Sequence, residues 1–498
     1  MDNSEGYPSF YTFLIGAFFI HFCLLFFDFF FKSCSHYPYI YFLANTGIQI
    51  NPLRITWFTS FFNRQIQKWG AVRPRIQTAW FSAGMWVSVF IMPISVFLVI
   101  HTIFSMMKSS LQDEKGFQQT LLVVEPLVPG WNLPASDFGY YLLALFFSSL
   151  LHELGHAMAA VREDVHLVGF SLTIFFVIPV VLTHLDQIDT LSSVKQLRIY
   201  CAGVWHNIFL ALVTAVVATA LPWFLFPFYD FGTGVQVENV VKDSSISGRG
   251  GLLIGDKITQ LNDCPVHGST SWQECLVFAL HDTNRGFCIP DSFIREHDES
   301  VPAKHLSESV IECCSNNSPH HLCFEYVGSE SEPLPLPQHS CLFARKVVEL
   351  SSSTCLSASD CLPSLHCFRP SLENSTKLIR IYRTQRPVVL YLGGPAEIYN
   401  SVKTSDFISL YSFLPSALPD AITKLCQFIT IFSSGIAILN IIPCFYFDGQ
   451  YIIRATLDIF LSSKVPVSSV RQAISLCVTI LGTLLLIFYT ITMLFTSV

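Results

Sequence analysis

The sequence predicts a polytopic α-helical membrane protein whose membrane segments flank a mainly β, cysteine-rich region. Of the 498 residues, 51% are hydrophobic and 13% are charged, whereas soluble domains usually carry about 25% charged residues. The hydrophobic residues also gather in runs as long as the roughly 20 residues that a helix needs to cross a bilayer. The net charge of -7 comes without a basic tract, which argues against nucleic acid as a partner because such binding depends on neutralising phosphates. We therefore expect the lipid bilayer to be a partner of the chain.

The first four apolar runs predict four membrane segments. They extend over residues 10–31, 79–104, 138–161 and 199–228. The loop after the first run holds six Lys or Arg residues and no Asp or Glu, so the positive-inside rule predicts that it is cytosolic. The first run follows no basic stretch and is longer than the core of a signal peptide, which predicts an uncleaved anchor.

Two further apolar stretches are interrupted. Residues 166–185 contain Gly169 and Pro179, and we expect a hairpin-like segment there instead of a clean span. The block of residues 422–498 is broken after Pro443. It predicts two membrane segments, of which the first is discontinuous.

The polar region of residues 229–405 is lumenal if the crossings are counted from the cytosolic loop. It holds ten of the 16 cysteines, and an even cluster in a polar segment predicts disulfides in an oxidising compartment. A zinc-binding cluster is the alternative, but no two of these cysteines have the C-x₂-C spacing of a zinc finger or ribbon. Asn316 and Asn374 begin Asn-x-Ser/Thr triplets, so both are candidate glycosylation sites of a lumenal loop.

Part of the polar region resembles a PDZ domain. The resemblance rests on Gly232–Val237 and on Leu253–Asn262, which give an opening strand, a Gly-Asp turn and an alternating strand. A strand-like segment resumes at Lys377–Tyr382. We therefore predict a lumenal PDZ-like, mainly β domain that carries the cysteine-rich segment as an insertion. The alternative is a folded lumenal spacer without a binding role.

The third apolar run contains the motif HELGH, formed by His152 to His156. On a helix the two histidines are four residues apart and lie on one face, where two imidazoles can bind one tetrahedral Zn²⁺. Glu153 lies about 100° further round the helix, from where it can take a proton from a water that the metal has made more acidic. The alternative is a set of hydrogen bonds between helices of a transporter or channel, which seldom needs this spacing.

Zinc in a catalytic site needs a third protein ligand, and the best candidate is Asp448. This acid lies within a hydrophobic block, beside the helix breakers Pro443 and Gly449. Irregular backbone at membrane depth usually lines a site, because its free polar groups must be satisfied. An ordinary Asp-Gly turn is the alternative interpretation.

These motifs resemble those of the site-2 protease family of intramembrane zinc metalloproteases, above all its animal members in the secretory pathway. HELGH matches the family's HExxH motif, and Asn440 to Gly449 match its Asn-Pro-Asp-Gly segment. The resemblance covers most of the chain. It departs from the family at Phe447, where the family usually has Leu, an apolar exchange that leaves metal ligation untouched.

Carried over position by position, the resemblance implies one Zn²⁺ held by His152, His156 and Asp448, with Glu153 as the catalytic acid-base. The stretch Gly203 to Asn207 is also similar to a segment near the site in family members. Its asparagine could contact the substrate backbone or the oxyanion, or join two helices as a hydrogen-bonding residue. Asn440 is a second candidate for such a contact.

The resemblance implies hydrolysis of a peptide bond in the transmembrane helix of membrane-anchored transcription factors, of the sterol regulatory element-binding protein type, after a first lumenal cut. A helix that unwinds readily is the expected substrate, and the Golgi or endoplasmic reticulum is the expected location. The sequence divides into residues 1–137, the catalytic core 138–228, the lumenal domain 229–405 and the C-terminal core 406–498. The alternatives are a multispanning transporter, although internal repeats are lacking, and a catalytically inactive binding protein.

Overall fold

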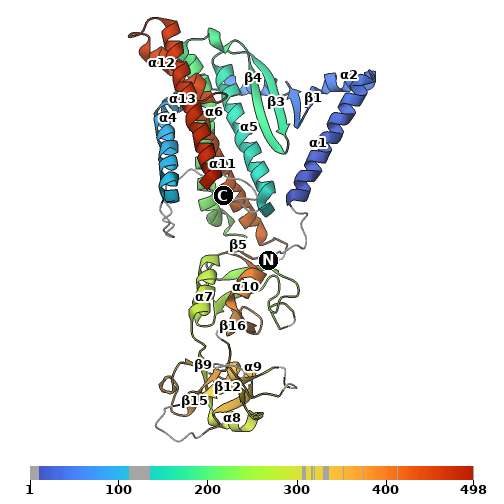
Figure 1. The fold of residues 1–498 in the computed structure, drawn as a ribbon, viewed down its shortest axis with the longest axis vertical. Coiled ribbons are helices and arrows are strands. Elements are labelled where there is room, and N and C mark those ends of the chain that lie inside the picture. The colour runs from blue at the N-terminus through green and yellow to red at the C-terminus, as the bar shows by residue number, and fades with distance from the viewer. Residues whose placement is uncertain are drawn as a thin grey trace. The chain divides into compact units, whose positions relative to one another are not determined.

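The computed structural model describes residues 10–111, 135–248, 250–305, 310–315, 318, 320–328, 336–351, 353–373, 375–411 and 413–496. The chain forms two compact units. The helical unit comprises the residues up to Ala220 and those from Ile422, and the β unit comprises Leu221–Ala421. Each unit is described by itself below (Figure 1).

The helical unit is built around long apolar helices. Among the described residues, six helices are long and apolar enough to cross a membrane. They are α1 (Phe10–Ser33), α4 (Pro74–Leu111), α5 (Phe138–Arg162), α6 (Ser193–Leu225), α11 (Ala417–Ile441) and α13 (Ser468–Thr496). The last apolar block breaks after Ile441, as the sequence predicts, and the short helix α12 (Asp448–Leu461) follows the break.

A four-stranded antiparallel sheet lies against these helices, with the order β1-β2-β3-β4. Its elements are β1 (Ile48–Asn51), β2 (Arg54–Thr59), β3 (Leu167–Phe175) and β4 (Ile178–Leu185), and the short helices α2 (Tyr37–Thr46) and α3 (Asn63–Ala71) flank the first two strands. The predicted hairpin of residues 166–185 is therefore present. β1 and β2 are not predicted from the charge of the basic loop, because charge does not reveal the strand-like alternation on both sides of the Asn-Pro-Leu turn.

Helix α5 is packed on opposite faces. On one face, Ala157 belongs to a core with Phe170 of β3 and Val181 of β4, and Figure 1 shows this hairpin beside α5. On the opposite face, Ala159 belongs to a core with Ile199 of α6. The hydroxyl of Ser148 also bonds that of Ser433 on α11 at 2.7 Å. Because hydrogen bonds between helices have no water to compete with them in a bilayer, they help to fix the helix register.

The β unit contains a sheet of six strands in the order β17-β16-β7-β6-β18, with β8 paired to β7. Its elements are β6 (Val235–Val240), β7 (Lys257–Leu261), β8 (Cys264–Pro265), α7 (Ser269–His281), β16 (Lys377–Arg383), β17 (Val389–Gly393), α10 (Pro395–Ser401) and β18 (Val402–Ser405). The three segments that the sequence predicted to be strands of one core are the neighbours β6, β7 and β16. The sheet confirms a β-rich region, whereas its identity as a PDZ domain stays a prediction.

A second sheet, of five strands, occupies the segment between α7 and β16, in the order β13-β12-β15-β9-β14. Its elements are β9 (Gly286–Pro290), α8 (Asp291–His297), β12 (His321–Tyr326), β13 (His339–Phe343), α9 (Ala344–Leu350), β14 (Thr354–Cys355) and β15 (Leu365–Pro370). The two-stranded pairs are β10 (Lys304–His305) with β11 (Ile311–Glu312), and β5 (Tyr229–Asp230) with β19 (Ile408–Ser409). Three 3₁₀ turns complete the described elements: η1 (Ala135–Asp137), η2 (Ile188–Thr190) and η3 (Ala358–Asp360).

All ten cysteines of the predicted cluster form disulfides, which confirms that interpretation over the zinc-binding alternative. The pairs are Cys264–Cys275, Cys288–Cys361, Cys313–Cys323, Cys314–Cys341 and Cys355–Cys367. The candidate glycosylation sites Asn316 and Asn374 lie outside the described residues. The lumenal side of this region and the four-part division of the sequence stay predictions.

A buried ion cluster joins the strands of the six-stranded sheet. The side chain of Asp256 is 3% exposed and pairs with Arg383 at 2.6 Å and with Arg386 at 2.9 Å. It also accepts a hydrogen bond from the backbone N–H of Leu253. The carboxylate therefore fixes the turn before β7 to the end of β16.

We predict that Asp256→Asn destabilises the β unit by about 3–5 kcal/mol, because it leaves the buried Arg383 guanidinium without its counter-charge. The urea dependence of proteolysis within the β unit of the full-length protein measures this change. The control is Glu349→Gln, which removes an exposed pair with Arg345 and should cost less than about 1 kcal/mol. Equal effects of the two substitutions would contradict the assignment.

Candidate functional site

Two buried imidazoles on α5 form the first part of the site. His152 is 6% exposed and His156 is 7% exposed. The four-residue spacing places both rings on one face of the helix, and their Nε2 atoms are 3.1 Å apart. The sequence-predicted pair is therefore brought together as expected.

Asp448 completes the group from a distant part of the chain. It is the first residue of α12 and follows the break after α11. Its Oδ2 atom lies 3.0 Å from Nε2 of His152 and 3.2 Å from Nε2 of His156. The three side chains form a group that could hold a metal ion.

The chemistry of these three groups fits a zinc ion. Nδ1 of His156 donates to the carbonyl of Ile199 at 2.8 Å, so its Nε2 carries a lone pair when the ring is neutral. Lone pairs of two rings and a carboxylate repel one another at 3.0–3.2 Å unless a cation or proton lies among them. Ligand atoms around a tetrahedral Zn²⁺ with bonds of about 2.0–2.1 Å lie roughly 3.3 Å apart, and two His with a carboxylate is a known catalytic donor set.

Glu153 stays outside the ligand group and is held by the neighbouring strand. Its Oε2 atom accepts the backbone N–H of Thr183 on β4 at 2.8 Å, and the Thr183 hydroxyl donates to the Glu153 carbonyl at 3.0 Å. One turn earlier, the hydroxyl of Ser149 accepts the N–H of Val181 at 2.9 Å. The strand thus orients the carboxylate, and the second oxygen makes no hydrogen bond with another residue that the structure describes.

The contact of Thr183 with Glu153 could not be predicted from the sequence. No local motif marks Thr183, because its partner Glu153 lies 30 residues earlier in the chain. Only the placement of the β3–β4 hairpin beside α5 brings the two together. The apolar pattern of residues 166–185 predicts the hairpin, but it does not indicate which residues the hairpin contacts.

Helix α6 approaches the ligand atoms closely through Gly203. A Cβ atom at this position would lie 2.8 Å from Nε2 of His152 and would also collide with Nε2 of His156. Gly155 on α5 allows the same close approach from the other helix, since a Cβ there would lie 2.7 Å from the Ala202 carbonyl oxygen. The two glycines let the helix backbones meet at the site, as small residues do between membrane helices.

The two asparagines predicted near the site differ in their surroundings. Asn207 on α6 is fully buried, with its amide nitrogen 3.2 Å from Nδ1 of His152. Asn440 is half-buried at the end of α11, and its side chain makes no hydrogen bond with another described residue. The structure therefore brings Asn207, and not Asn440, into direct contact with a candidate ligand.

The backbone of the break before Asp448 is held in an unusual conformation. Tyr446 has a φ of 70°, which is uncommon for a non-glycine residue, and its side chain is 98% exposed. The backbone N–H of Phe445 donates to the hydroxyl of Thr483 on α13 at 3.1 Å. Contacts of this kind satisfy irregular backbone that lies between apolar helices.

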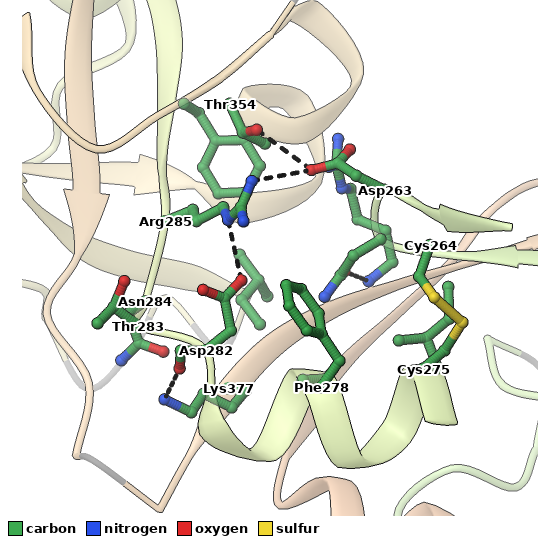
Figure 2. A pocket seen from close by; sticks show the side chains of 16 residues that line it. Asp263, Cys264, Cys275, Phe278, Asp282, Thr283, Asn284, Arg285, Thr354 and Lys377 are labelled. Atoms are coloured by element: carbon green, nitrogen blue, oxygen red, sulfur yellow. Dashed lines mark hydrogen bonds and ion pairs between the residues drawn. A yellow bond between two sulfur atoms is a disulfide. The ribbon is translucent and has the colours of Figure 1, made fainter. Parts of the chain in front are cut away.

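The β unit also contains a pocket among its described residues. Figure 2 shows Arg285 between the carboxylates of Asp263 and Asp282. Asp263 also pairs with Arg380 at 3.0 Å, and Lys377 donates to the Asp282 carbonyl at 2.8 Å. Because these polar groups bond one another, we interpret the pocket as a seam between the two sheets of the β unit.

The chain is similar in sequence to proteins of a known peptidase family. The model of Peptidase family M50 matches residues 140–486, a range that contains both histidines, Glu153 and Asp448. The chain is also similar to a membrane-bound transcription factor site-2 protease homolog from Arabidopsis thaliana, with 23% identity over 443 residues. This match covers 80% of the present chain and 84% of the relative.

We predict that Gly203→Ala weakens zinc binding at least about tenfold, because the added methyl group must displace the atoms proposed to hold the metal. Zinc content of the purified full-length protein after dialysis against a chelator measures the effect. Gly435→Ala on α11 is the matched control, since nothing lies within 4 Å of its added Cβ. Unchanged zinc retention in Gly203→Ala would refute the close approach of α6.

Proposed function

The chain belongs to peptidase family M50, and we propose that it is an intramembrane zinc metalloprotease. The observation that carries the proposal is the convergence of His152, His156 and Asp448 at 3.0–3.2 Å beside Glu153. Helix α5, which presents three of the four residues, is long and apolar enough to cross a membrane. A hydrolytic site built on such helices acts on peptide bonds at membrane depth.

In this proposal the four residues divide the chemistry between them. The two histidines and Asp448 hold one Zn²⁺, which when bound polarises the scissile carbonyl and makes an attacking water more acidic. Glu153 accepts the proton of that water and returns it to the leaving nitrogen. The N–H of Thr183 holds one carboxylate oxygen of Glu153 at 2.8 Å, so the other oxygen is the one that exchanges the proton.

The proposed substrates are membrane-anchored proteins with a transmembrane helix that unwinds locally. Unwinding is required because the carbonyls of an intact helix are already hydrogen-bonded and shielded. The relative from Arabidopsis thaliana is named for membrane-bound transcription factors, which supports this substrate class. Transcription factors of the sterol regulatory element-binding protein type, cut first on their lumenal side, are the specific substrates that we propose.

The proposed location is the Golgi or endoplasmic reticulum, with residues 229–405 in the lumen. Five disulfides in the β unit support an oxidising compartment for that region. A PDZ-like module on this side could screen substrates by size or bind a trimmed end at a strand edge. Such screening would follow the first cut and precede cleavage in the membrane.

A transporter and a catalytically inactive binding protein are the alternatives to this proposal. A transporter would use the buried His, Glu and Asp side chains for ion coupling. An inactive protein would bind the same substrates without cutting them. Under both alternatives the protein cuts no substrate. Replacing Glu153 would then leave the amount of substrate cleavage in cells unchanged.

We predict that Glu153→Gln lowers release of the cytosolic domain of a once-cut membrane substrate by about 10²- to 10⁴-fold. The same variant should retain zinc, because the side chain is outside the ligand group. His156→Ala should lose both zinc and release. Release is measured in cells that lack the endogenous activity, and zinc is measured on the purified full-length protein.

Gly139→Ala on α5 is the control for expression and insertion, since nothing lies within 4 Å of its added Cβ. Undiminished release of the substrate's cytosolic domain by Glu153→Gln would contradict the protease assignment. Loss of zinc in that variant would instead assign Glu153 to the ligands.

A further inference from the structure

One buried polar atom beside the candidate ligands lacks a partner. Asn207 is 0% exposed, and its Oδ1 atom makes no hydrogen bond within the described part of the chain. Its Nδ2 atom instead faces Nδ1 of His152 at 3.2 Å. A buried carbonyl oxygen without a donor is costly, so the orientation of this amide needs a physical explanation.

The ring chemistry of His152 decides the orientation. If Nδ2 of Asn207 donates to Nδ1, the proton of the neutral ring must be on Nε2. Nε2 is the atom that faces Asp448 at 3.0 Å, and a protonated Nε2 cannot bind a metal. For Nε2 to serve as a ligand, Nδ1 must carry the proton and find an acceptor.

We propose that in the metal-bound protein the Asn207 amide points its Oδ1, and not its Nδ2, at His152, so that Oδ1 accepts the Nδ1–H of that ring. The two ends of an amide are distinguished by their hydrogen bonds and not by their shape. This orientation gives Nδ1–H its acceptor and removes the buried carbonyl oxygen that had no donor. Asn207 is then a positioning residue that holds His152 in the tautomer whose Nε2 faces the metal.

Helix α6 supplies the hydrogen-bond acceptor for the Nδ1–H of both histidines. The Ile199 carbonyl accepts the Nδ1–H of His156 at 2.8 Å, and Asn207 lies eight residues further along α6. Gly203 lies midway between them, and a Cβ atom added there would collide with the proposed ligand atoms. Positions at i, i+4 and i+8 lie along one face of a helix, so one stripe of α6 supplies both acceptors and the space between them.

Burial separates this role from a contact with substrate. The sequence left open that Asn207 contacts substrate or the oxyanion, which requires an amide that substrate can reach. The side chain is fully buried and already engaged with His152. A partner that orients a ligand in this way typically changes metal affinity by about 10- to 100-fold.

The inference rests on the proposed metal site, and its test measures zinc affinity instead of cleavage. Zinc is competed from the purified full-length protein with a chelator of known affinity. Asn207→Leu keeps a similar volume but offers no acceptor, and we expect about 10- to 100-fold weaker zinc binding. Asn207→Asp keeps an acceptor at the Oδ1 position, and we expect an affinity within about threefold of the wild type or tighter.

Thr214→Val is the matched control on the same helix. Thr214 is buried, and its hydroxyl bonds that of Thr430 on α11 at 2.7 Å, so the substitution removes a hydrogen bond between helices away from the metal. We expect unchanged zinc affinity. This control separates loss of the His152 partner from general loosening of α6.

The outcomes are distinguishable from one another. If wild-type protein binds no zinc, the proposed function itself fails. If the wild type binds zinc and Asn207→Leu binds it equally well, the positioning role fails while the protease proposal stands. If Asn207→Asp binds zinc about 10- to 100-fold more weakly than the wild type, the inference is overturned, and this comparison with the wild type holds even if Asn207→Leu does not fold.

Discussion

The mutual approach of two imidazole nitrogens and one carboxylate oxygen, at 3.0–3.2 Å, is the constraint on which the helical unit depends. Three lone pairs so close together repel one another unless positive charge lies among them. Contacts with three neighbouring elements hold α5 in place at the site. β4 holds one side of α5, α6 packs on another through two glycines, and α11 is tied to α5 by Ser148 and Ser433.

The role that we propose for Asp448 as the third ligand accounts for the break in the apolar C-terminal block. In a continuous helix, the direction of the Asp448 side chain would be determined by the 3.6-residue period of that helix. Instead, α11 ends at Ile441 and α12 begins at Asp448. The carboxylate therefore lies at the start of a new helix, and the direction of its side chain does not depend on α11. The irregular backbone of the break is then satisfied by neighbours such as Thr483, which is the condition for such backbone within a membrane.

The sequence predicted those features whose physical cause is local. HELGH specifies its own geometry because both histidines are on one helix, and the helix breakers around Asp448 are visible in the chain. Features that depend on contacts between distant segments, such as that of Thr183 with Glu153, could not be predicted from the sequence. Disulfide pairing is similar: Cys323 and Cys341 face each other in strand register, yet they bond the adjacent Cys313 and Cys314. Strand register and hairpin placement are set by the whole core, so no spacing rule recovers them.

X-ray absorption at the zinc edge of the purified full-length protein tests the central claim most directly, because it reports the ligand atoms without reference to cleavage. The account predicts one zinc per chain with only nitrogen and oxygen neighbours at about 2.0–2.2 Å, including the scattering pattern of two imidazole rings. Sulfur neighbours near about 2.3 Å would place the metal on thiols such as the buried Cys201 or Cys444. That result, or protein free of zinc, would contradict the account.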